Sequence, residues 1–171
     1  MDIKDAYKYC PKCGHRADKQ TNHLHCPNCG HDYYFNPKPV TSVILKNEND
    51  EYLFVIRAAE PRKGYLDFPG GFAENGETLE ECSVREVKEE LGVKVSNLKY
   101  LSAHVDTYLY QGVRSYVTGV AYTGDLPKNA KLKPADDVAG WELHALADVP
   151  MDRLAFPSMP EMIAVLKAKS D

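Results

Sequence analysis

The chain has 171 residues, of which 43% are hydrophobic and 27% are charged, which is enough for one packed core and a small appendage. A formal net charge of −4 predicts no overall attraction to nucleic acid or to an anionic membrane surface, so a polyanionic substrate must be held locally by metal ions or a few basic side chains. No apolar run approaches the roughly 20 residues that span a bilayer, and the N-terminus lacks the apolar core of a signal peptide, so we expect a cytoplasmic protein with no membrane partner.

Four of the five cysteines form two CxxC knuckles, CPKC and CPNC, near the N-terminus. The twelve residues between the knuckles are the spacing of a zinc ribbon, in which four thiolates complete the tetrahedral shell of a structural Zn²⁺. The predicted ligands are Cys10, Cys13, Cys26 and Cys29. A pair of disulfides, or reactive CxxC thiols, is the alternative interpretation.

The same segment also contains four histidines, a residue type that can replace cysteine as a zinc ligand. They are His15, His23, His25 and His31. Because four cysteines already close the shell, we expect each histidine to be solvent-exposed or to support the ligands from outside.

The junction after the cysteines, YYFNPKPV over residues 33–40, combines three aromatic residues with two prolines. This composition predicts a stiff, packed connection rather than a flexible linker. We therefore divide the chain into a zinc ribbon over residues 1–36 and a larger domain over residues 37–171.

The larger domain mixes predicted strands and helices. Strands are predicted where apolar and β-branched residues lie between turn-forming residues, at 40–46, 51–59, 94–111 and 113–124. Helices are predicted at 77–92, which ends on a glycine, and at 158–170. The prolines and glycines of residues 61–71 indicate a loop, and residues 141–149 are interpreted as the end of a strand running into a short helix. This mixture predicts an α/β or α+β domain.

Acidic residues are concentrated in the helix predicted at 77–92. Glu86, Glu89 and Glu90 are spaced i, i+3 and i+4, so their carboxylates share one face of the helix, near its negative C-terminal end. Like charges at this spacing cost a few tenths of a kcal/mol per pair. Arg85 and Lys88 could compensate on a solvated acidic helix, whereas a hard divalent cation such as Mg²⁺ or Mn²⁺ would compensate more strongly. The charge pattern alone leaves both interpretations open.

The complete spacing from Gly71 to Val93 resembles the Nudix box. This pattern is glycine-x5-glutamate-x7-arginine-glutamate-aliphatic-x-glutamate-glutamate-x-glycine-aliphatic, and every defined position is matched. The resemblance implies an α/β/α sandwich around a mixed sheet, in which the box forms loop–helix–loop. It also implies hydrolysis of a nucleoside diphosphate linked to another moiety, by water attack on phosphorus with a divalent metal ion.

The resemblance also implies roles for single residues of the box. Glu86, Glu89 and Glu90 match the ligands of the catalytic Mg²⁺ or Mn²⁺, and the Gly71 carbonyl is an additional candidate ligand. Arg85 and Glu77 match the pair that braces the helix. Cys82 stands at an unconstrained position of the box, where we expect burial rather than catalysis.

The order of the segments, a zinc ribbon followed by an aromatic and proline-rich junction and a Nudix domain, is similar to that of the NADH pyrophosphatases. That family has a serine-glutamine-proline-tryptophan-rich stretch shortly after the box, which accompanies its preference for nicotinamide dinucleotides. The corresponding residues here are LSAHVDTYLY, 101–110, and lack the motif. We therefore expect no strong preference for NADH.

Substrate contacts are predicted from weaker signals. Basic residues that precede the box and could meet phosphates are Arg57, Arg62 and Lys63, although such loop charges are often merely solvated. Aromatic residues that could stack on a base or sugar are Phe72, Tyr108 and Tyr110, for which rim or core packing is the alternative. The acidic candidates for the general base are Asp136, Asp137 and Glu142, and ordinary loop carboxylates are the alternative for each.

Three functions from different classes follow. The first is a metal-dependent pyrophosphohydrolase of ADP-ribose, a dinucleotide, a nucleotide sugar or a similar small-molecule nucleotide. The second is an NADH or NAD pyrophosphatase, or an RNA-decapping Nudix enzyme that uses the ribbon as a contact surface. The third is a non-catalytic nucleic-acid-binding or regulatory Nudix protein, against which the net negative charge and the complete box both argue. The sequence is also compatible with a homodimer.

Overall fold

The computed structural model describes residues 1–170, and these residues form two compact units. The first unit contains residues 1–38 and 107–117, and the second contains residues 39–106 together with those from 118 onward. The sequence did not predict that residues 107–117 group with the N-terminal segment, and the boundary between residues 36 and 37 stays a prediction. Within the described residues, no helix combines the length and apolarity needed to cross a membrane.

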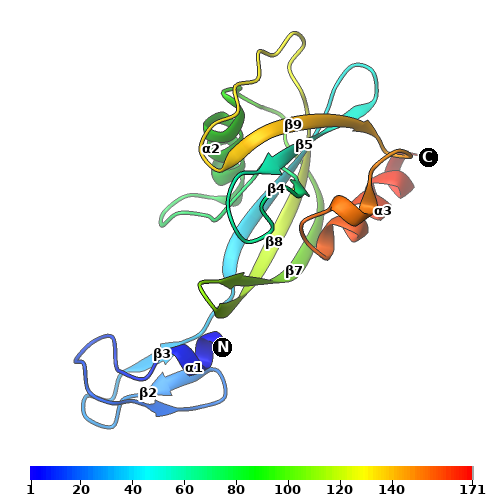
Figure 1. The fold of residues 1–171 in the computed structure, drawn as a ribbon. Helices are drawn as coiled ribbons and strands as arrows, with labels where there is room; N and C mark the ends of the chain where they lie inside the picture. The colour runs from blue at the N-terminus through cyan, green and yellow to red at the C-terminus, as the bar shows by residue number, and fades with distance from the viewer. Residues whose placement is uncertain (171) are drawn as a thin grey trace. The chain divides into compact units, whose positions relative to one another are not determined.

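The first unit is a small three-stranded antiparallel sheet preceded by one turn of helix (Figure 1). Its elements are α1 (Ile3–Ala6), β1 (Asp18–Lys19), β2 (His23–His25) and β3 (Asp32–Tyr34), with the strand order β1-β2-β3. Leu24 is buried, and the ring of Tyr7 lies 5.8 Å from the rings of both Tyr33 and Phe35. This apolar cluster is too small to stabilise a fold by itself.

Two backbone contacts connect residues 107–117 to the N-terminus within this unit. The amino group of Met1 donates to the carbonyl of Gly112 at 2.7 Å, and the N–H of Arg114 donates to the carbonyl of Met1 at 2.7 Å. The hydroxyl of Tyr116 also donates to Asp2 at 2.9 Å. These contacts explain why the turn between two long strands belongs to the N-terminal unit.

The main sheet contains six strands, in the order β6-β5-β4-β8-β7, with β9 also paired to β5. The strands are β4 (Lys38–Lys46), β5 (Glu51–Arg57), β6 (Leu66–Asp67), β7 (Lys99–Tyr110), β8 (Val113–Asp125) and β9 (Val138–Ala145). The last residues of β7, the first residues of β8 and the turn between them, 107–117 together, are grouped with the first unit, as is Lys38 at the start of β4, whereas the other residues of the sheet belong to the second.

Two helices cover opposite faces of this sheet, α2 (Leu79–Leu91) and α3 (Ser158–Ser170) (Figure 1). Successive side chains of a strand point to opposite faces. On one face, Val43 and Leu45 of β4 pack in the same core as Val87 of α2. On the other face, Ile44 packs in the same core as Ile163 of α3. The predicted α/β/α sandwich around a mixed sheet is therefore confirmed.

The predicted elements agree with the structure in type, with differences in bounds and near two loops. The strand predicted at 94–111 begins only at Lys99, because residues 93–98 form a loop after α2, and the strand predicted at 51–59 ends at Arg57. The helix predicted at 158–170 has these bounds in the structure. The loop predicted at 61–71 includes the two-residue strand β6. The short helix predicted within 141–149 was wrong, because β9 ends at Ala145 in a turn closed by a hydrogen bond from the Asp148 N–H to the Ala145 carbonyl, and a 3₁₀ helix follows only at Met151–Arg153.

Candidate functional site

The ends of α2 are fixed by residues of the box. Thr78 caps the N-terminus, where the Glu81 N–H donates to its hydroxyl and the Thr78 N–H donates to the Glu81 carboxylate at 2.8 Å. This capping box is visible in the sequence as threonine-x-x-glutamate, a signal that the sequence interpretation missed. At the other end Gly92 adopts φ 72°, a left-handed conformation that glycine accepts without strain. The caps set which turn of the helix presents the box glutamates.

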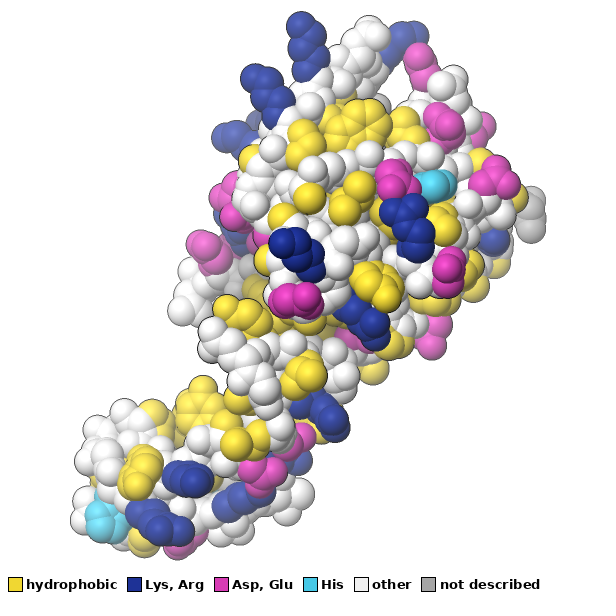
Figure 2. Space-filling model, in the orientation of Figure 1, with side chains coloured by type: hydrophobic (Ala, Val, Ile, Leu, Met, Phe, Trp, Pro, Cys, Tyr) yellow, Lys and Arg dark blue, Asp and Glu magenta, His cyan; other side chains and the backbone are white. Residues whose placement is uncertain are grey.

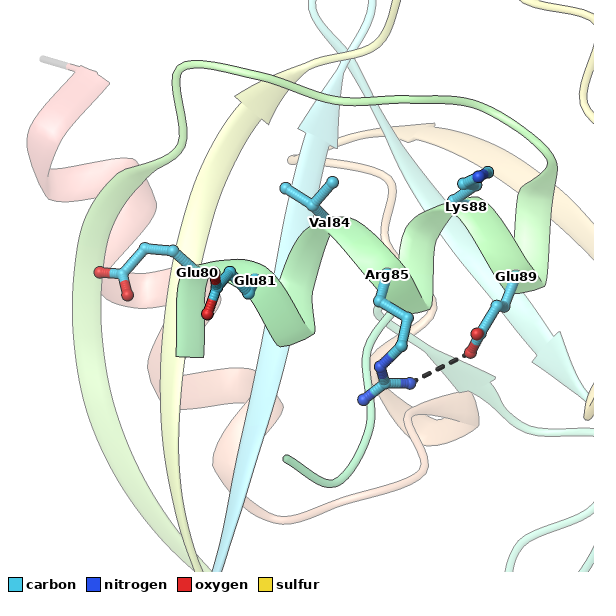
Figure 3. Close-up of a pocket in the computed structure, with 6 residues that line it drawn as sticks. All are labelled: Glu80, Glu81, Val84, Arg85, Lys88 and Glu89. Atoms are coloured by element: carbon cyan, nitrogen blue, oxygen red, sulfur yellow. Dashed lines mark hydrogen bonds and ion pairs between the residues drawn. The ribbon is translucent and has the colours of Figure 1, made fainter. Parts of the chain in front are cut away.

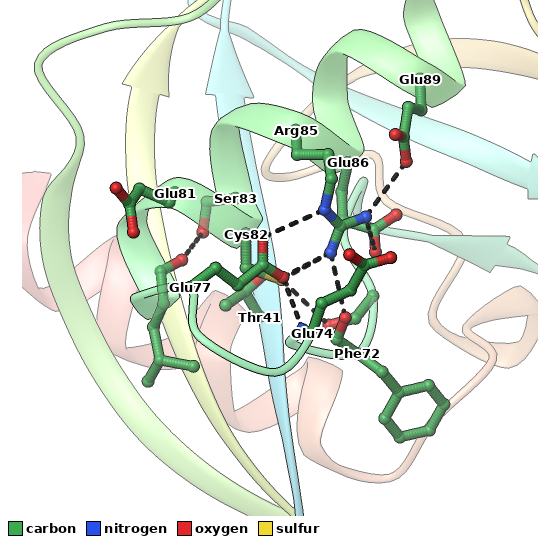
Figure 4. A network of polar contacts seen from close by, with 12 residues as sticks. Thr41, Phe72, Glu74, Glu77, Glu81, Cys82, Ser83, Arg85, Glu86 and Glu89 are labelled. Atoms are coloured by element: carbon green, nitrogen blue, oxygen red, sulfur yellow. Dashed lines mark hydrogen bonds and ion pairs between the residues drawn. The ribbon is translucent and has the colours of Figure 1, made fainter.

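Arg85 is the centre of a polar network on α2 (Figure 4). It donates two hydrogen bonds to Glu77, at 2.6 and 3.1 Å, which is the bidentate geometry expected of the predicted brace. It also donates to Glu86 at 2.8 Å and to Glu89 at 3.1 Å, and to the carbonyl of Phe72 at 3.1 Å. Hydrogen bonds from Arg85, and then from the Glu74 N–H, lower the pKa of Glu77 to about 2. One guanidinium thus links the loop before the helix to two of the three box carboxylates.

The glycine pair at the start of the box, Gly70 and Gly71, allows two carboxylates of α2 to approach the backbone. A Cβ on Gly71 would lie 2.4 Å from Oε1 of Glu86, so no other residue fits there without displacing that carboxylate. Gly70 has φ 147°, and its N–H donates to Oε2 of Glu90 at 3.1 Å. The Gly71 carbonyl, a predicted metal ligand, accepts from the Thr41 N–H at 2.9 Å. The loop therefore packs directly against Glu86 and Glu90.

Negative charge is concentrated where α2 meets this loop. Glu90 is only 4% exposed, and burial, followed by the nearby charge of Asp137, raises its pKa to about 9. Burial also raises the pKa of Glu86, against the lowering effect of Arg85. Asp67 of β6 belongs to the same group, because burial raises its pKa to about 6 and its charge adds to the shift of Glu90. The sequence interpretation missed Asp67, which lies outside the box and carries no motif of its own.

The outer side of α2 has a shallow hollow of about 550 Å³ (Figure 3). It is lined by Glu80, Glu81, Val84, Arg85, Lys88 and Glu89. The side chain of Glu89 is 49% exposed and that of Glu86 is 13% exposed. Among the three box carboxylates, that of Glu89 is therefore the most accessible to solvent.

The three predicted general-base residues have different surroundings. Glu142 accepts from Arg153 at 2.7 and 3.0 Å and contacts His144 at 2.9 Å, and Arg153 lowers the pKa of its carboxyl. It also pairs in register with Phe54, which packs in the core on the α3 face of the sheet, opposite to α2. The assignment of a base stays a prediction, although this geometry directs Glu142 away from the box.

Asp136 and Asp137 lie on the loop before β9. Asp136 has a positive φ of 54° and an exposed side chain. The backbone carbonyl of Asp137 accepts from the Ala58 N–H at 2.7 Å, which anchors the loop to the end of β5. The charge of Asp137 contributes to the raised pKa values of Glu86, Glu90 and Asp67, so this carboxylate is near enough to act on the box group electrostatically.

Among the predicted phosphate-binding residues, Arg57 is held inside the protein. It donates to Asp67 at 2.8 Å and to the Pro61 carbonyl at 2.8 Å, and its guanidinium lies 5.2 Å from the ring centre of Phe156. These contacts position Arg57 beside the acidic group and use much of its donor capacity. Arg62 lies 5.3 Å from the ring centre of Tyr65, and Lys63 is exposed.

The predicted aromatic contacts fall in different units. Phe72 follows Gly71 and is 37% exposed, and its carbonyl is the one that Arg85 binds. Tyr108 belongs to the first unit, where its ring centre lies 6.4 Å from that of Tyr110. The roles of both residues stay predictions. Cys82 has no exposed surface and lies 3.5 Å from the Thr41 hydroxyl, so its predicted burial is confirmed.

The four cysteines of the first unit form a second group of ligands. Their sulfur atoms all lie within 4.8 Å of one another, and no other His, Cys, Asp or Glu group of three or more among residues 1–170 is as compact. All four are free thiols, with no disulfide between them. The sulfur of Cys10 lies 3.8 Å from that of Cys29, and the sulfur of Cys13 lies 3.6 Å from that of Cys26. This geometry suits a metal ion bound by four sulfurs.

Among the described residues, the compact ligand group includes none of the four histidines of this segment. His25 contacts Asp32 at 2.7 Å, and His23 lies 3.8 Å from the same carboxylate while stacking on Tyr34 at 5.0 Å between ring centres. His15 is exposed, and its carbonyl accepts from the Cys10 N–H at 2.8 Å. The thiols therefore account for the compact ligand group by themselves.

Comparison with known proteins identifies one family over most of the chain. Residues 36–166 match the profile of the NUDIX domain. The chain is 34% identical over 96 residues to a protein named NAD-capped RNA hydrolase NudC from Vibrio vulnificus, and 36% identical over 99 residues to one of the same name from Shigella flexneri. These matches cover 56% and 57% of this chain but only 37% and 38% of the relatives, so the chain spans well under half the length of the curated relatives it matches.

Solved structures agree at the level of the fold. A NUDIX hydrolase from Nitrosomonas europaea has a TM-score of 0.74 at 21% identity, covering 96% of this chain and 93% of that one. The NUDIX domain of Shewanella oneidensis NrtR, solved with ADP ribose, has a TM-score of 0.67 at 21% identity, covering 86% and 94%. Because both identities are low, these likenesses concern the fold alone.

Proposed function

The chain belongs to the NUDIX family, and on this basis we propose that it is a metal-dependent pyrophosphohydrolase that cleaves the diphosphate linkage of a nucleoside diphosphate derivative by water attack on phosphorus. The observation that carries the proposal is the packing of Glu86 and Glu90 against the Gly70–Gly71 loop, beside Asp67 and Asp137. ADP-ribose, dinucleotides and nucleotide sugars share the linkage that such a site would attack.

We assign Glu86, Glu89 and Glu90 as the ligands of Mg²⁺ or Mn²⁺. Their donor atoms are all oxygen, which hard divalent cations prefer. The raised pKa values of Glu86 and Glu90 support the assignment, because a cation would relieve the burial of negative charge beside Asp137. When bound, the cation neutralises the diphosphate and makes the attacking water more acidic. The Gly71 carbonyl, which accepts from the Thr41 N–H at 2.9 Å and more weakly from the Cys82 thiol at 3.7 Å, is a further candidate ligand.

The chain's own residues divide the remaining tasks. Arg85 and Glu77 hold the loop against the helix, so Glu86 keeps its place beside Gly71. Among the three acidic candidates we assign Asp137 to accept the proton from water, because its charge acts on the box group whereas Glu142 is paired with Arg153. Arg57 pairs with Asp67 at 2.8 Å and so offsets part of the negative charge that Asp67 adds to the box group.

We also propose that the cysteine cluster holds a structural Zn²⁺. Four sulfur ligands favour zinc over hard cations, and a closed shell of four leaves no position for substrate. The first unit has few buried apolar residues, so a bound ion would supply much of its folding free energy.

The test is hydrolysis by the purified full chain with Mg²⁺ or Mn²⁺. ADP-ribose, NADH, a nucleotide sugar and a nucleoside triphosphate would each be incubated with wild type and with Glu89→Gln. We expect two-product cleavage of at least one diphosphate and a loss of kcat by orders of magnitude in the variant, because the lost carboxylate binds the cation.

Glu80→Gln is the matched control, since it removes one exposed carboxylate from the same helix and should keep activity. The proposed activity is wrong if none of these substrates is cleaved with either metal. Full activity of Glu89→Gln at saturating Mg²⁺ would instead remove Glu89 from the metal site.

A second candidate function is hydrolysis of a nicotinamide dinucleotide attached to the 5′ end of RNA. It is favoured by the relatives named NAD-capped RNA hydrolase, which are 34–36% identical over their matched residues. The chemistry would be the same, because such a cap contains the same diphosphate linkage. The absence of the tryptophan-rich stretch at 101–110 argues against a strong preference for free NADH.

The two candidates are separated by kcat/KM for free NADH, ADP-ribose and an RNA carrying an NAD cap. Preference for NADH over ADP-ribose above roughly a hundredfold would contradict the expected weak discrimination, since a single contact supplies only about 1–3 kcal/mol of selectivity. A preference for the capped RNA over free NADH would establish the second candidate.

A further inference from the structure

The charged residues of the chain are divided unequally between the two units. The first unit has seven lysines and arginines against four aspartates, whereas the rest of the chain has 14 basic against 21 acidic residues. The net charge of −4 is therefore +3 on one unit and −7 on the other. Four thiolates with one Zn²⁺ would lower the first value to +1 without removing any basic side chain. The overall charge thus does not exclude a polyanion bound by the first unit.

The two zinc knuckles share one backbone pattern. In each, the glycine after the second cysteine donates to the carbonyl of the first cysteine at 2.9 Å, from Gly14 to Cys10 and from Gly30 to Cys26. In each, the first cysteine also donates to the carbonyl five residues later, at 2.8 and 3.0 Å. The knuckles can therefore be compared position by position.

The two knuckles differ at the residue before the first cysteine and at the residue six positions after that cysteine. In the second knuckle His25 pairs with Asp32, and their side chains form a contact of 2.7 Å. In the first knuckle the equivalent antiparallel pair is Tyr9 with Arg16. Side chains directly opposite in an antiparallel pair lie on the same face. The second knuckle thus presents a neutralised pair where the first presents a ring beside a cation.

The tyrosine and arginine of the first knuckle are open to solvent. Tyr9 is 61% exposed, and Arg16 is exposed and has no ion pair within residues 1–170. Lys8 and Lys12, on either side of Tyr9 along the chain, are also exposed and have no ion pair in the described part of the chain. On the face drawn in Figure 2, basic side chains of this unit alternate with hydrophobic ones. Because the second knuckle folds with a neutralised pair, zinc binding does not require this arrangement.

We propose that the first unit binds single-stranded RNA on the first-knuckle surface, defined as Lys8, Tyr9, Lys12 and Arg16. An exposed aromatic ring stacks on a base whatever its identity, and neighbouring cations contact the phosphates. A duplex hides the base faces that the ring needs, so the ligand is single-stranded. The choice of RNA rests on the second candidate function, in which the enzyme must hold an RNA chain as well as its cap.

The experiment measures fluorescence anisotropy of a 3′-labelled oligoadenylate of about 12 nucleotides, a length within the range that such surfaces cover. The probe has a 5′-hydroxyl, so it contains no diphosphate linkage and cannot be cleaved by the proposed activity. The full chain is used with its zinc content measured for every variant. Parallel arms use the same length of single-stranded DNA, duplex RNA and heparin.

Tyr9→Ala should weaken RNA binding about tenfold, as expected for the loss of one stacked base, whereas Tyr9→Phe should bind like wild type. Arg16→Ala should reduce the magnitude of the slope of log K against log salt by about 0.7, the value for one phosphate contact on a single strand. The matched control is the double variant His25→Ala/Asp32→Ala, which changes the equivalent pair of the second knuckle and should not weaken binding.

Three results would overturn the inference. They are no binding of the RNA at low salt, equal weakening by the first-knuckle and second-knuckle variants, and heparin binding that matches RNA binding and is unaffected by Tyr9→Ala. Tighter binding of the DNA strand would reject the choice of RNA. Failure of the hydrolysis proposal would appear separately, as absence of cleavage of ADP-ribose and NADH by a chain that still binds the probe.

Discussion

The two units concentrate potential metal ligands in opposite ways. In the first, four thiols gather within 4.8 Å in a unit with little apolar core. In the second, carboxylates that repel one another are held on a capped helix whose other face packs in a large core. A small unit needs the ion in order to fold, whereas a large core can supply the free energy that holds repelling charges together. The same event, loss of metal, should therefore have different consequences in the two units.

The largest expected effect is on the structure of the first unit. Cys26→Ser should abolish stoichiometric zinc and unfold this unit, because three sulfurs no longer complete the shell. Two-dimensional NMR would show the amide signals of residues 1–38 collapsing to unfolded positions while those of the second unit persist. Cys82→Ala is the control, since Cys82 is buried beside Thr41 in the second unit. A folded first unit in zinc-free Cys26→Ser would remove the contrast between the units.

The next effect is on activity with the fold intact. Gly71→Ala should lower kcat by about a hundredfold, because the new Cβ would lie 2.4 Å from Oε1 of Glu86 and displace that carboxylate. Gly140→Ala is the control, as its Cβ would meet nothing nearer than 3.5 Å. Steady-state kinetics and thermal melting would be measured together. Unchanged kcat in Gly71→Ala would show that the position of Glu86 is not critical.

A smaller effect concerns stability without metal. The pKa of Glu90 is raised to about 9 from 4.5, so the unfolded chain releases this proton first and stability falls as the pH rises between these values. In metal-free protein at pH 8, Glu90→Gln should raise Tm by at least about 3 °C, and the difference should shrink at pH 5. The variant should also lose the gain in Tm that we expect Mg²⁺ to give the wild type. A lower Tm at pH 8 would contradict this account of Glu90.

The smallest effect is expected at the brace. The pKa of Glu77 is lowered to about 2 from 4.5, so its pairing with Arg85 stabilises the protein above pH 4.5 and is lost as the pH falls towards 2. Glu77→Gln should lower Tm by a few degrees at pH 7, and by less at pH 3. Glu74→Gln, an exposed neighbour, should change little. An equal loss of Tm at both pH values would show that the ion pair is not the cause.

The fold and the local parts of both candidate sites could be predicted because they depend on short spacings. The interval between the CxxC knuckles brought four sulfurs together, and the box spacing placed Glu77 against Arg85 on α2. The helix predicted at 158–170 also has its predicted bounds. Each knuckle is closed by one short turn, and regular helical backbone fixes where the side chains of α2 and α3 lie.

Contacts between segments far apart in the chain were decided only by the tertiary structure. Asp67 and Asp137 reach the box from β6 and from the loop before β9, whereas Arg153 pairs with Glu142 and Asp67 pairs with Arg57. No periodicity connects these positions, because strand pairing and the packing of helices on a sheet set their distances. For the same reason, composition gave one net charge for the whole chain, while folding separated it into a basic unit and an acidic one.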